Sequence, residues 1–273
     1  MKSNFVRNIW MTLVAIVTFI NLNSTLLGAE MTNTPVPMAK MLSTNKMFSV
    51  DISSIGSTKY LQWETGLPLH EGPVIQNEVI VTHVPTGLYL DLWNSYAFSG
   101  KLSEYENYGN EIDFIFGWSK TTEKGWNWDV GMAYINEPPF GTWGKNDSIW
   151  PYVKFGKNQK VLGQEVNFYG RFDSYTPLRG SGYKGDKIFS LGTETTFEVT
   201  SWLSVPVKSD FGYVTEGMGM NTGGFRWKGQ IGTEWKVLSW MKITFPTATV
   251  YRDLGWNEYK SDWMFWGGFK ISL

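Results

Sequence analysis

The sequence of 273 residues contains no cysteine and only two histidines. Without cysteine the chain can form no disulfide and can carry no lipid on a cysteine side chain. A zinc site normally needs a cluster of histidine and cysteine ligands, so no metal site is expected. The Gly-rich stretch 216–224 lacks the lysine of a P-loop, so no phosphate-bearing cofactor is expected either. The sequence therefore predicts a protein without cofactors.

An excess of basic residues is also missing, because the formal net charge is only −1. Nucleic-acid-binding domains are usually strongly basic, so we expect no nucleic-acid partner. Beyond the first 29 residues there is no apolar run of about 20 residues, and thus no expected transmembrane helix.

The N-terminal residues indicate export. Lys2 and Arg7 precede an apolar stretch over 9–20, and Leu27, Gly28 and Ala29 precede a cleavage position before Glu30. This pattern predicts a cleaved signal peptide over 1–29. A retained N-terminal anchor is the alternative. Residues 30–57 show no sustained period, which predicts a flexible periplasmic extension, or alternatively a plug folded into the following domain.

Aromatic residues are abundant, with 15 Trp, 13 Tyr and 17 Phe. In the stretch 110–135 they alternate with polar residues. Ile112, Phe114 and Phe116 share one strand face, and Glu111 and Asp113 share the other. Period-two alternation is typical of strands with one apolar and one polar face. Repeated around a ring at about 10 residues per strand, it is typical of a transmembrane β-barrel whose aromatic residues lie at the membrane interfaces.

The alternation continues to the C-terminus and predicts an all-β fold, an antiparallel up-and-down transmembrane barrel over 58–273. The twelve expected strands lie near 59–66, 74–83, 87–98, 110–119, 126–135, 147–156, 164–173, 188–200, 203–214, 225–237, 240–252 and 262–273. Connections after the even-numbered strands are short, such as 84–87, 120–125 and 157–163. Connections after the odd-numbered strands, such as 136–146 and 174–187, are longer. Short periplasmic turns alternating with longer external loops are typical of outer-membrane barrels, so we expect this location, with lipid and lipopolysaccharide as neighbours.

The last strand supports the same location. Its apolar face carries Trp263, Phe265, Phe269 and Ile271, and the strand runs to the final residue, Leu273. It resembles the C-terminal signal that outer-membrane barrels present to the barrel-assembly machinery, which we therefore expect as a partner. That signal usually ends on Phe, and Leu273 departs from it.

Short motifs in the first half resemble a known family. They are Tyr60, Gly66, the run 72–76 (GPVIQ), the run 90–94 and the run 110–113 (NEID) with Gly117. Over about 58–156 they are similar to the small porins of the TorF type and related outer-membrane barrels. The resemblance implies a barrel that forms a pore, and it implies no catalytic residues.

Charged residues at inward strand positions are the candidate functional residues. They predict an acidic wall on the early strands and a basic wall on the late strands, about opposite each other in a closed ring. The acidic wall comprises Asp91, Glu111, Asp113 and Asp129, and the basic wall comprises Lys208, Arg226, Lys228, Lys242, Arg252 and Lys270. Such walls can select small polar solutes by their electric field, so we expect a porin-like channel for passive diffusion of small hydrophilic solutes. In the alternative, the same charges pair across a narrow lumen and form a largely occluded structural or adhesive barrel.

An enzyme is the least favoured alternative. A lipid hydrolase needs a nucleophile with a base in reach, whereas His70 and His83 lie in different parts of the chain, neither near a distinctive serine motif. We expect a solvated His70, although a protease using it with loop aspartates is a further alternative. We therefore expect that the protein is not an enzyme.

Overall fold

The structure is a computed structural model that describes residues 46–62, 66, 68–98, 110–137, 147–178, 185–215, 223–254 and 261–273. The predicted signal peptide over 1–29 lies outside these residues. All regular structure in the described part is β-strand. Within those same residues, no helix is long and apolar enough to cross a membrane.

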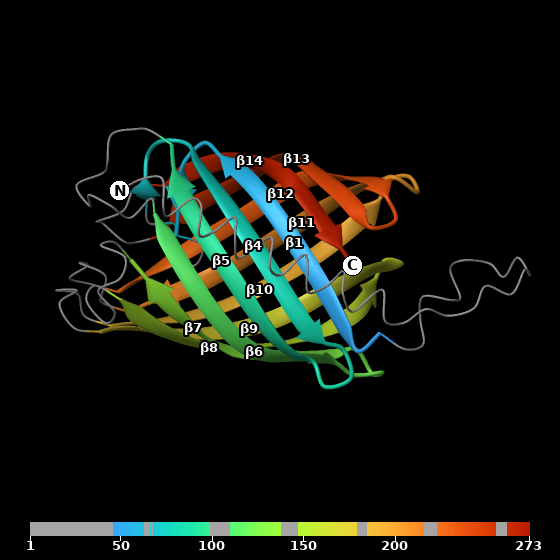
Figure 1. Cartoon of the computed structure of the whole chain (residues 1–273), viewed down its shortest axis with the longest axis horizontal. Helices are drawn as coiled ribbons and strands as arrows, with labels where there is room; N and C mark the ends of the chain where they lie inside the picture. Colours follow the sequence, from blue (N-terminus) through green and yellow to red (C-terminus); the bar gives the residue numbers. More distant parts are fainter. Residues whose placement is uncertain are drawn as a thin grey trace, which may run out of the picture. The chain divides into compact units, whose positions relative to one another are not determined.

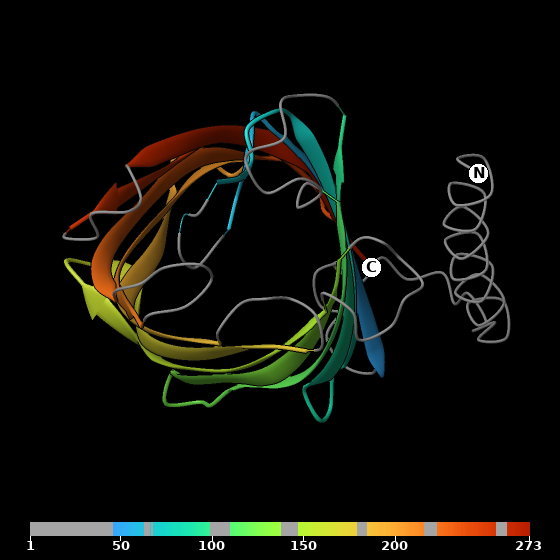
Figure 2. The same ribbon diagram turned by 90° about the vertical axis from the view of Figure 1, so that its left-hand side faces the viewer.

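Twelve of the described strands pair antiparallel in a closed ring (Figures 1 and 2). The ring has the order β1, β14, β13, β12, β11, β10, β9, β8, β7, β6, β5, β4, in which β4 pairs with β1. The predicted all-β, closed twelve-stranded barrel is therefore confirmed. The strands of the ring are β1 (Phe48–Ser57), β4 (Val74–His83), β5 (Leu88–Ala97), β6 (Glu111–Thr121), β7 (Trp126–Asn136), β8 (Ser148–Val161), β9 (Gln164–Pro177), β10 (Asp186–Glu198), β11 (Leu203–Val214), β12 (Gly224–Leu238), β13 (Met241–Asp253) and β14 (Asp262–Ser272).

The first strand differs from the prediction. The expected barrel strand near 59–66 is wrong, because β1 begins at Phe48 and closes the barrel between β4 and β14. The expected flexible extension over 30–57 is wrong for 48–57, and its residues 30–45 lie outside the described part of the chain. The sequence of β1, FSVDISSIGS, is rich in serine and has few large apolar residues. Its own alternation is weak, and hydrogen bonds to two neighbouring strands hold it in the sheet.

Short and long connections alternate as predicted. Short turns join β4 to β5, β6 to β7, β8 to β9, β10 to β11 and β12 to β13. The turn before β9 is tighter than the expected 157–163, because β8 continues to Val161 and only Leu162 and Gly163 remain, both with positive φ. Longer connections join the other pairs at the opposite end. We call these the short-turn end and the long-connection end.

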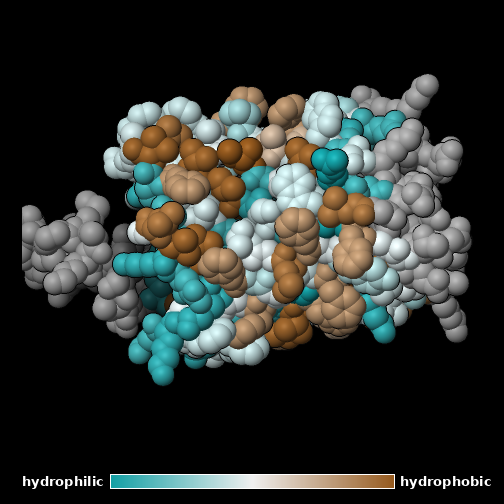
Figure 3. Space-filling view, turned by 180° about the vertical axis from the view of Figure 1, so that it is seen from behind, coloured by the Kyte–Doolittle hydropathy of each residue, from teal (hydrophilic) through white to brown (hydrophobic). Residues whose placement is uncertain are grey.

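The outer face of the barrel is apolar. Large apolar side chains at alternate positions point away from the lumen and are well exposed, for example Phe116 at 55% and Leu191 at 72%. Figure 3 shows apolar side chains spread over one side of this face. An apolar outer band around a polar interior is the pattern of a barrel that crosses a lipid bilayer.

A β-bulge on β13 reverses the alternation along that strand. The register between β13 and β14 shifts between Thr244 and Thr247, and the register with β12 shifts at the same level. Pro246 lies in this gap and has no backbone N–H for the ladder. Even-numbered residues point inward before the bulge, as Lys242 does, whereas odd-numbered residues such as Tyr251 point inward after it.

The first long connection, which joins β1 to β4, folds into the barrel mouth. We call it the inserted connection. It carries β2 (Tyr60–Leu61) and β3 (Pro68–His70), which form a separate two-stranded sheet. Leu61 packs against Tyr251 and Met264 of the wall, and Figure 2 shows the described part of this connection inside the ring of strands. The mouth is therefore narrowed on the side of β13 and β14.

Candidate functional site

In the described part of the chain, two cavities lie in the lumen at different levels. A cavity of about 420 Å³ lies toward the long-connection end, where Ser57, Tyr60 and Glu111 line it. A second cavity of about 800 Å³ lies toward the short-turn end. We call them the long-connection chamber and the short-turn chamber. Asp129 and Gln230 line both chambers, so these two side chains mark the boundary between the chambers, which we call the waist.

The acidic residues predicted from the sequence lie on one side of the lumen. Glu111, Asp113 and Asp129 line the long-connection chamber from β6 and β7. Asp91 of β5 stands beside Ile115, which lines the same chamber. Glu78, which is not among the predicted acidic residues, adds a carboxylate from β4. The alternation within β4 was the signal that could have found it.

Two of these carboxylates have an unused acceptor. The Oδ1 atoms of Asp91 and Asp113 are buried without a hydrogen-bond partner. An acceptor left unpaired in a buried position costs free energy. This side of the chamber is therefore well suited to donors brought by water or by a solute.

Tyr60 connects the inserted connection to the acidic side. Its hydroxyl donates a hydrogen bond of 2.8 Å to Glu111 Oε2. Burial, together with the neighbouring carboxylates Glu111 and Asp113, holds the pKa of Tyr60 well above its ordinary value, so it remains a donor at any physiological pH.

Just beyond β7, burial close to Glu111 and Asp147 raises the pKa of Glu137 to about 9. Glu137 therefore adds no negative charge to the mouth at neutral pH.

The opposite side of the waist is basic. Five cationic side chains gather there from β8, β9, β11 and β12, around the single carboxylate of Asp210. We call them the waist cluster: Lys154, Arg171, Lys208, Arg226 and Lys228. Arg226 Nη1 donates to Asp210 Oδ1 at 2.5 Å, and Lys228 Nζ lies 3.3 Å from Asp210 Oδ2. Both side chains are 3% exposed, so this part of the cluster belongs to the wall rather than to the open lumen.

Other members of the cluster reach toward the chambers. Lys154 donates to Glu194 at 3.0 Å, and Arg171 donates to Asp173 at 2.7 Å. The ammonium groups of Lys154 and Lys208 lie 4.3 and 5.4 Å from the ring centroid of Tyr169. The negative face of an aromatic ring stabilises cations at such distances.

Tyrosines form the rest of the waist. The Tyr89 hydroxyl donates a hydrogen bond of 2.8 Å to Asp129 and shares a second hydrogen bond with the Tyr152 hydroxyl. The guanidinium of Arg171 lies over the Tyr152 ring, 4.8 Å from its centroid. The chain Asp129, Tyr89, Tyr152 and Arg171 thus joins the acidic side to the basic side along the wall.

Glycines allow these tyrosines to lie flat against the wall. Gly117 stands opposite Tyr89, and Gly192 stands opposite Tyr169. A Cβ atom would lie 2.4 Å from the Tyr89 ring at the first position and 2.5 Å from the Tyr169 ring at the second. The absence of a side chain therefore keeps each ring from being pushed into the lumen.

The structure separates three predicted basic residues from this cluster. Lys242 and Lys270 face the interior near the short-turn end, where they pair with Glu234 at 2.6 Å and Asp51 at 3.2 Å. The predicted inward position of Arg252 is wrong. It stands opposite Trp227 in the register, on the outer face, because the bulge at Pro246 reverses the alternation. Lys208, Arg226 and Lys228 lie together, but Arg226 and Lys228 are buried in the wall and do not line the lumen as predicted. Lys154 joins them, although it is not among the predicted basic residues.

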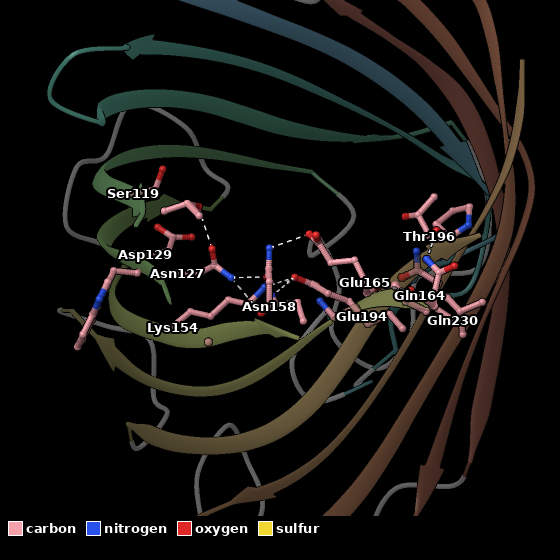
Figure 4. A pocket seen from close by; sticks show the side chains of 18 of the residues that line it. Ser119, Asn127, Asp129, Lys154, Asn158, Gln164, Glu165, Glu194, Thr196 and Gln230 are labelled. Atoms are coloured by element: carbon pink, nitrogen blue, oxygen red, sulfur yellow. Dashed lines mark hydrogen bonds and ion pairs between the residues drawn. The ribbon is translucent and has the colours of Figure 1, made fainter. Parts of the chain in front are cut away.

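The short-turn chamber is lined by a ladder of amide and carboxylate side chains (Figure 4). Asn127 Nδ2 donates to Asn158 Oδ1 at 2.6 Å and to Asn167 Oδ1 at 3.1 Å. Asn167 donates in turn to Glu194 at 2.7 Å, and Asn158 donates to Glu165 at 2.9 Å. These hydrogen bonds hold the polar groups along β7–β10, so they line the chamber without crossing it.

The two histidines lie at different ends of the barrel. His70, in the inserted connection, is 1% exposed, so the expectation of a solvated side chain is wrong. His83 lies at the short-turn end, where Nδ1 is 2.7 Å from Thr86 Oγ1. They do not form a joint site. Among the described residues no group of three or more His, Cys, Asp or Glu is arranged to hold a metal ion.

No protein-family model and no curated protein matches this chain. Among solved structures, it is similar to the NanC porin at 10% identity, covering 83% of this chain and 100% of that one, with a TM-score of 0.49. It is also similar to an outer membrane channel from Pseudomonas putida F1, at 10% identity, 88% and 100% coverage and a TM-score of 0.49. A third likeness is to the translocator domain of the autotransporter NalP from Neisseria meningitidis, at 10% identity, 85% and 91% coverage and a TM-score of 0.46. Likenesses this distant carry no argument about the activity of this chain, and the barrel assignment rests on its own strand pairing.

Proposed function

We propose that the protein is an outer-membrane, porin-like channel for passive diffusion of small hydrophilic solutes. The observation that carries this proposal is the pair of chambers, about 420 and 800 Å³, that carry charged side chains and share Asp129 and Gln230 inside a closed barrel. A continuous polar lumen lets solutes pass without leaving water, while the apolar outer face suits lipid.

The charges at the waist support a field-selected pathway. Carboxylates on β4–β7 face the lumen from one side, and the waist cluster stands on β8–β12. In the ring, β5 and β6 are six strands away from β11 and β12. Opposite charges on opposite walls produce a transverse field, which low-dielectric surroundings strengthen. A dipolar solute is oriented by such a field as it crosses the waist.

A largely occluded structural or adhesive barrel is the second candidate, and one observation favours it. The inserted connection buries Leu61, Leu69 and His70 in the mouth. In that case the chambers are internal cavities without a through path.

Planar-bilayer recording of the full-length protein, purified from membranes, separates the two candidates. If the protein is a channel, we expect discrete current steps that are linear in voltage. If it is an occluded barrel, we expect fully folded protein to pass no current. Heat-modifiable migration in gels supplies the folding control, because closed barrels migrate differently before and after boiling.

Location and partners belong to the same proposal. The short turns face the periplasm, the last strand is recognised by the barrel-assembly machinery, and lipid and lipopolysaccharide surround the apolar face. Membership of the TorF-type porins, signal-peptide cleavage and the lack of enzymatic activity stay predictions. Fractionation of cells into inner and outer membranes tests the location, and N-terminal sequencing of the purified protein tests cleavage before Glu30.

A further inference from the structure

The waist cluster encloses a small space of about 20 Å³, separate from both chambers. Its lining contains five cationic side chains but only one carboxylate, that of Asp210, together with Tyr169 and Ser190. A space of this size holds about one water-sized group. Outside the lining, Glu194 and Asp173 pair with Lys154 and Arg171. Five cations against three carboxylates leave an excess of positive charge, which favours a negative occupant.

The one carboxylate of the lining is already engaged. Asp210 Oδ1 accepts from Arg226, and Asp210 Oδ2 faces Lys228. Arg226 is 2% exposed, and its Nε is buried without a hydrogen-bond partner. A guanidinium donor in such a position is costly unless an acceptor reaches it. The unpaired donor is therefore a second indication of an anionic occupant, independent of the number of cations.

The small space adjoins both chambers. Lys154 and Lys208 line both the small space and the short-turn chamber. Arg171 lines both the small space and the long-connection chamber. An anion in either chamber thus meets a cationic side chain that belongs to the cluster.

We propose that the waist cluster is a binding site for a single small anionic group. The group is either a free halide or the carboxylate of a solute that pauses at the waist. The site deepens the proposed channel function, and it rests on that function only in requiring a water-filled lumen. Lys154 and Lys208 receive the anion, and Arg226 supplies the donor deepest in the wall.

Chloride-35 NMR on the folded full-length protein in detergent micelles tests the site without requiring ion flow. Exchange between water and a protein site broadens the chloride line, and the broadening saturates with chloride concentration. Lys208→Met removes one cation but leaves the contacts of Asp210 with Arg226, Lys228 and Tyr169 in place. It should weaken chloride binding about tenfold, the scale of one charge-assisted hydrogen bond. If this variant does not fold, Lys154→Met tests the same prediction.

Lys242→Met is the matched control, because it removes another inward-facing lysine, which pairs with Glu234 and lies outside the cluster. It should leave the broadening unchanged. Equal loss in both variants, or no saturable broadening in the wild-type protein, overturns the site. Acetate then distinguishes the two sources. Displacement of chloride by acetate supports a solute carboxylate, and chloride binding that acetate leaves unchanged supports a halide. A folded protein that passes no current in a bilayer but still binds chloride would contradict the channel proposal and support the anion site.

Discussion

Arg226 and Asp210 form an ion pair of 2.5 Å in which neither side chain is more than 3% exposed. Removing one partner of a buried pair leaves a charge in a medium of low polarity, which typically costs about 3–5 kcal/mol. Here Lys228 remains close to Asp210, so we expect Arg226→Met to lower the free energy of unfolding by about 3 kcal/mol, at the lower end of that range.

The control for this prediction is Lys242→Met, which breaks the more exposed pair with Glu234. Exposed pairs contribute about 1 kcal/mol or less. Urea titration of folding into lipid vesicles measures both variants. Equal costs would show that Arg226 is solvated, and the waist cluster would then be part of the open lumen.

The apolar outer face can be tested at Phe116, in the middle of β6. Arginine at a lipid-facing position near the bilayer midplane costs about 2–4 kcal/mol, so Phe116→Arg should reduce stability by this amount in the same titration. Thr196 lines the short-turn chamber, and Thr196→Arg should cost far less because its charge stays in water. Similar losses for both variants would mean that the inward and outward faces are assigned wrongly.

The bulge on β13 makes a prediction that simple alternation does not. Residues 242 and 252 are both even-numbered, yet the structure places Lys242 inside the barrel and Arg252 outside. A fluorophore on Arg252→Cys should be quenched by lipids with a nitroxide near the headgroup, whereas one on Lys242→Cys should be quenched only by a water-soluble agent. Lipid quenching at both positions would place the register shift elsewhere.

The period-two alternation of the sequence predicts the inward and outward faces of regular strands but not those of irregular ones. Regular strands such as β6 and β7 place Glu111, Asp113 and Asp129 correctly, because each residue reverses face relative to the previous one. Arg252 was misplaced because a bulge depends on how β12, β13 and β14 fit together, which no single strand records. β1 was missed for a related reason, since its strand conformation depends on two neighbours that lie far away in the sequence.

The waist cluster could also be predicted from the sequence only in part. Lys154 follows Trp150 and Tyr152 in alternation, so its inward direction was available from the sequence. Its position beside Lys208 was not, because it depends on the stagger between strands. The burial of Arg226 and Lys228 around Asp210 also follows from register, whereas the sequence analysis expected them to line an open wall.

Charge selectivity should follow the acidic side of the lumen. Asp113→Asn combined with Asp129→Asn should shift the reversal potential toward anions in a salt gradient. The shift should shrink at high salt, since the Debye length falls from about 10 Å at 0.1 M to about 3 Å at 1 M. Glu123→Gln, in a short turn, serves as the control and should have little effect. A reversal potential that ignores the double variant at low salt would indicate that these carboxylates do not face the ion path.

The central claim is that an open path crosses the waist, and neighbouring residues of β12 test it most directly. Gln230 lines both chambers, whereas Ile231 points outward and is 56% exposed. Single-channel currents are recorded from Gln230→Cys and Ile231→Cys before and after a charged, water-soluble thiol reagent is added. The account predicts a clear drop in the current of Gln230→Cys and an unchanged current of Ile231→Cys. Folded protein that passes no current, or a current that the reagent at position 230 leaves unchanged, would contradict it.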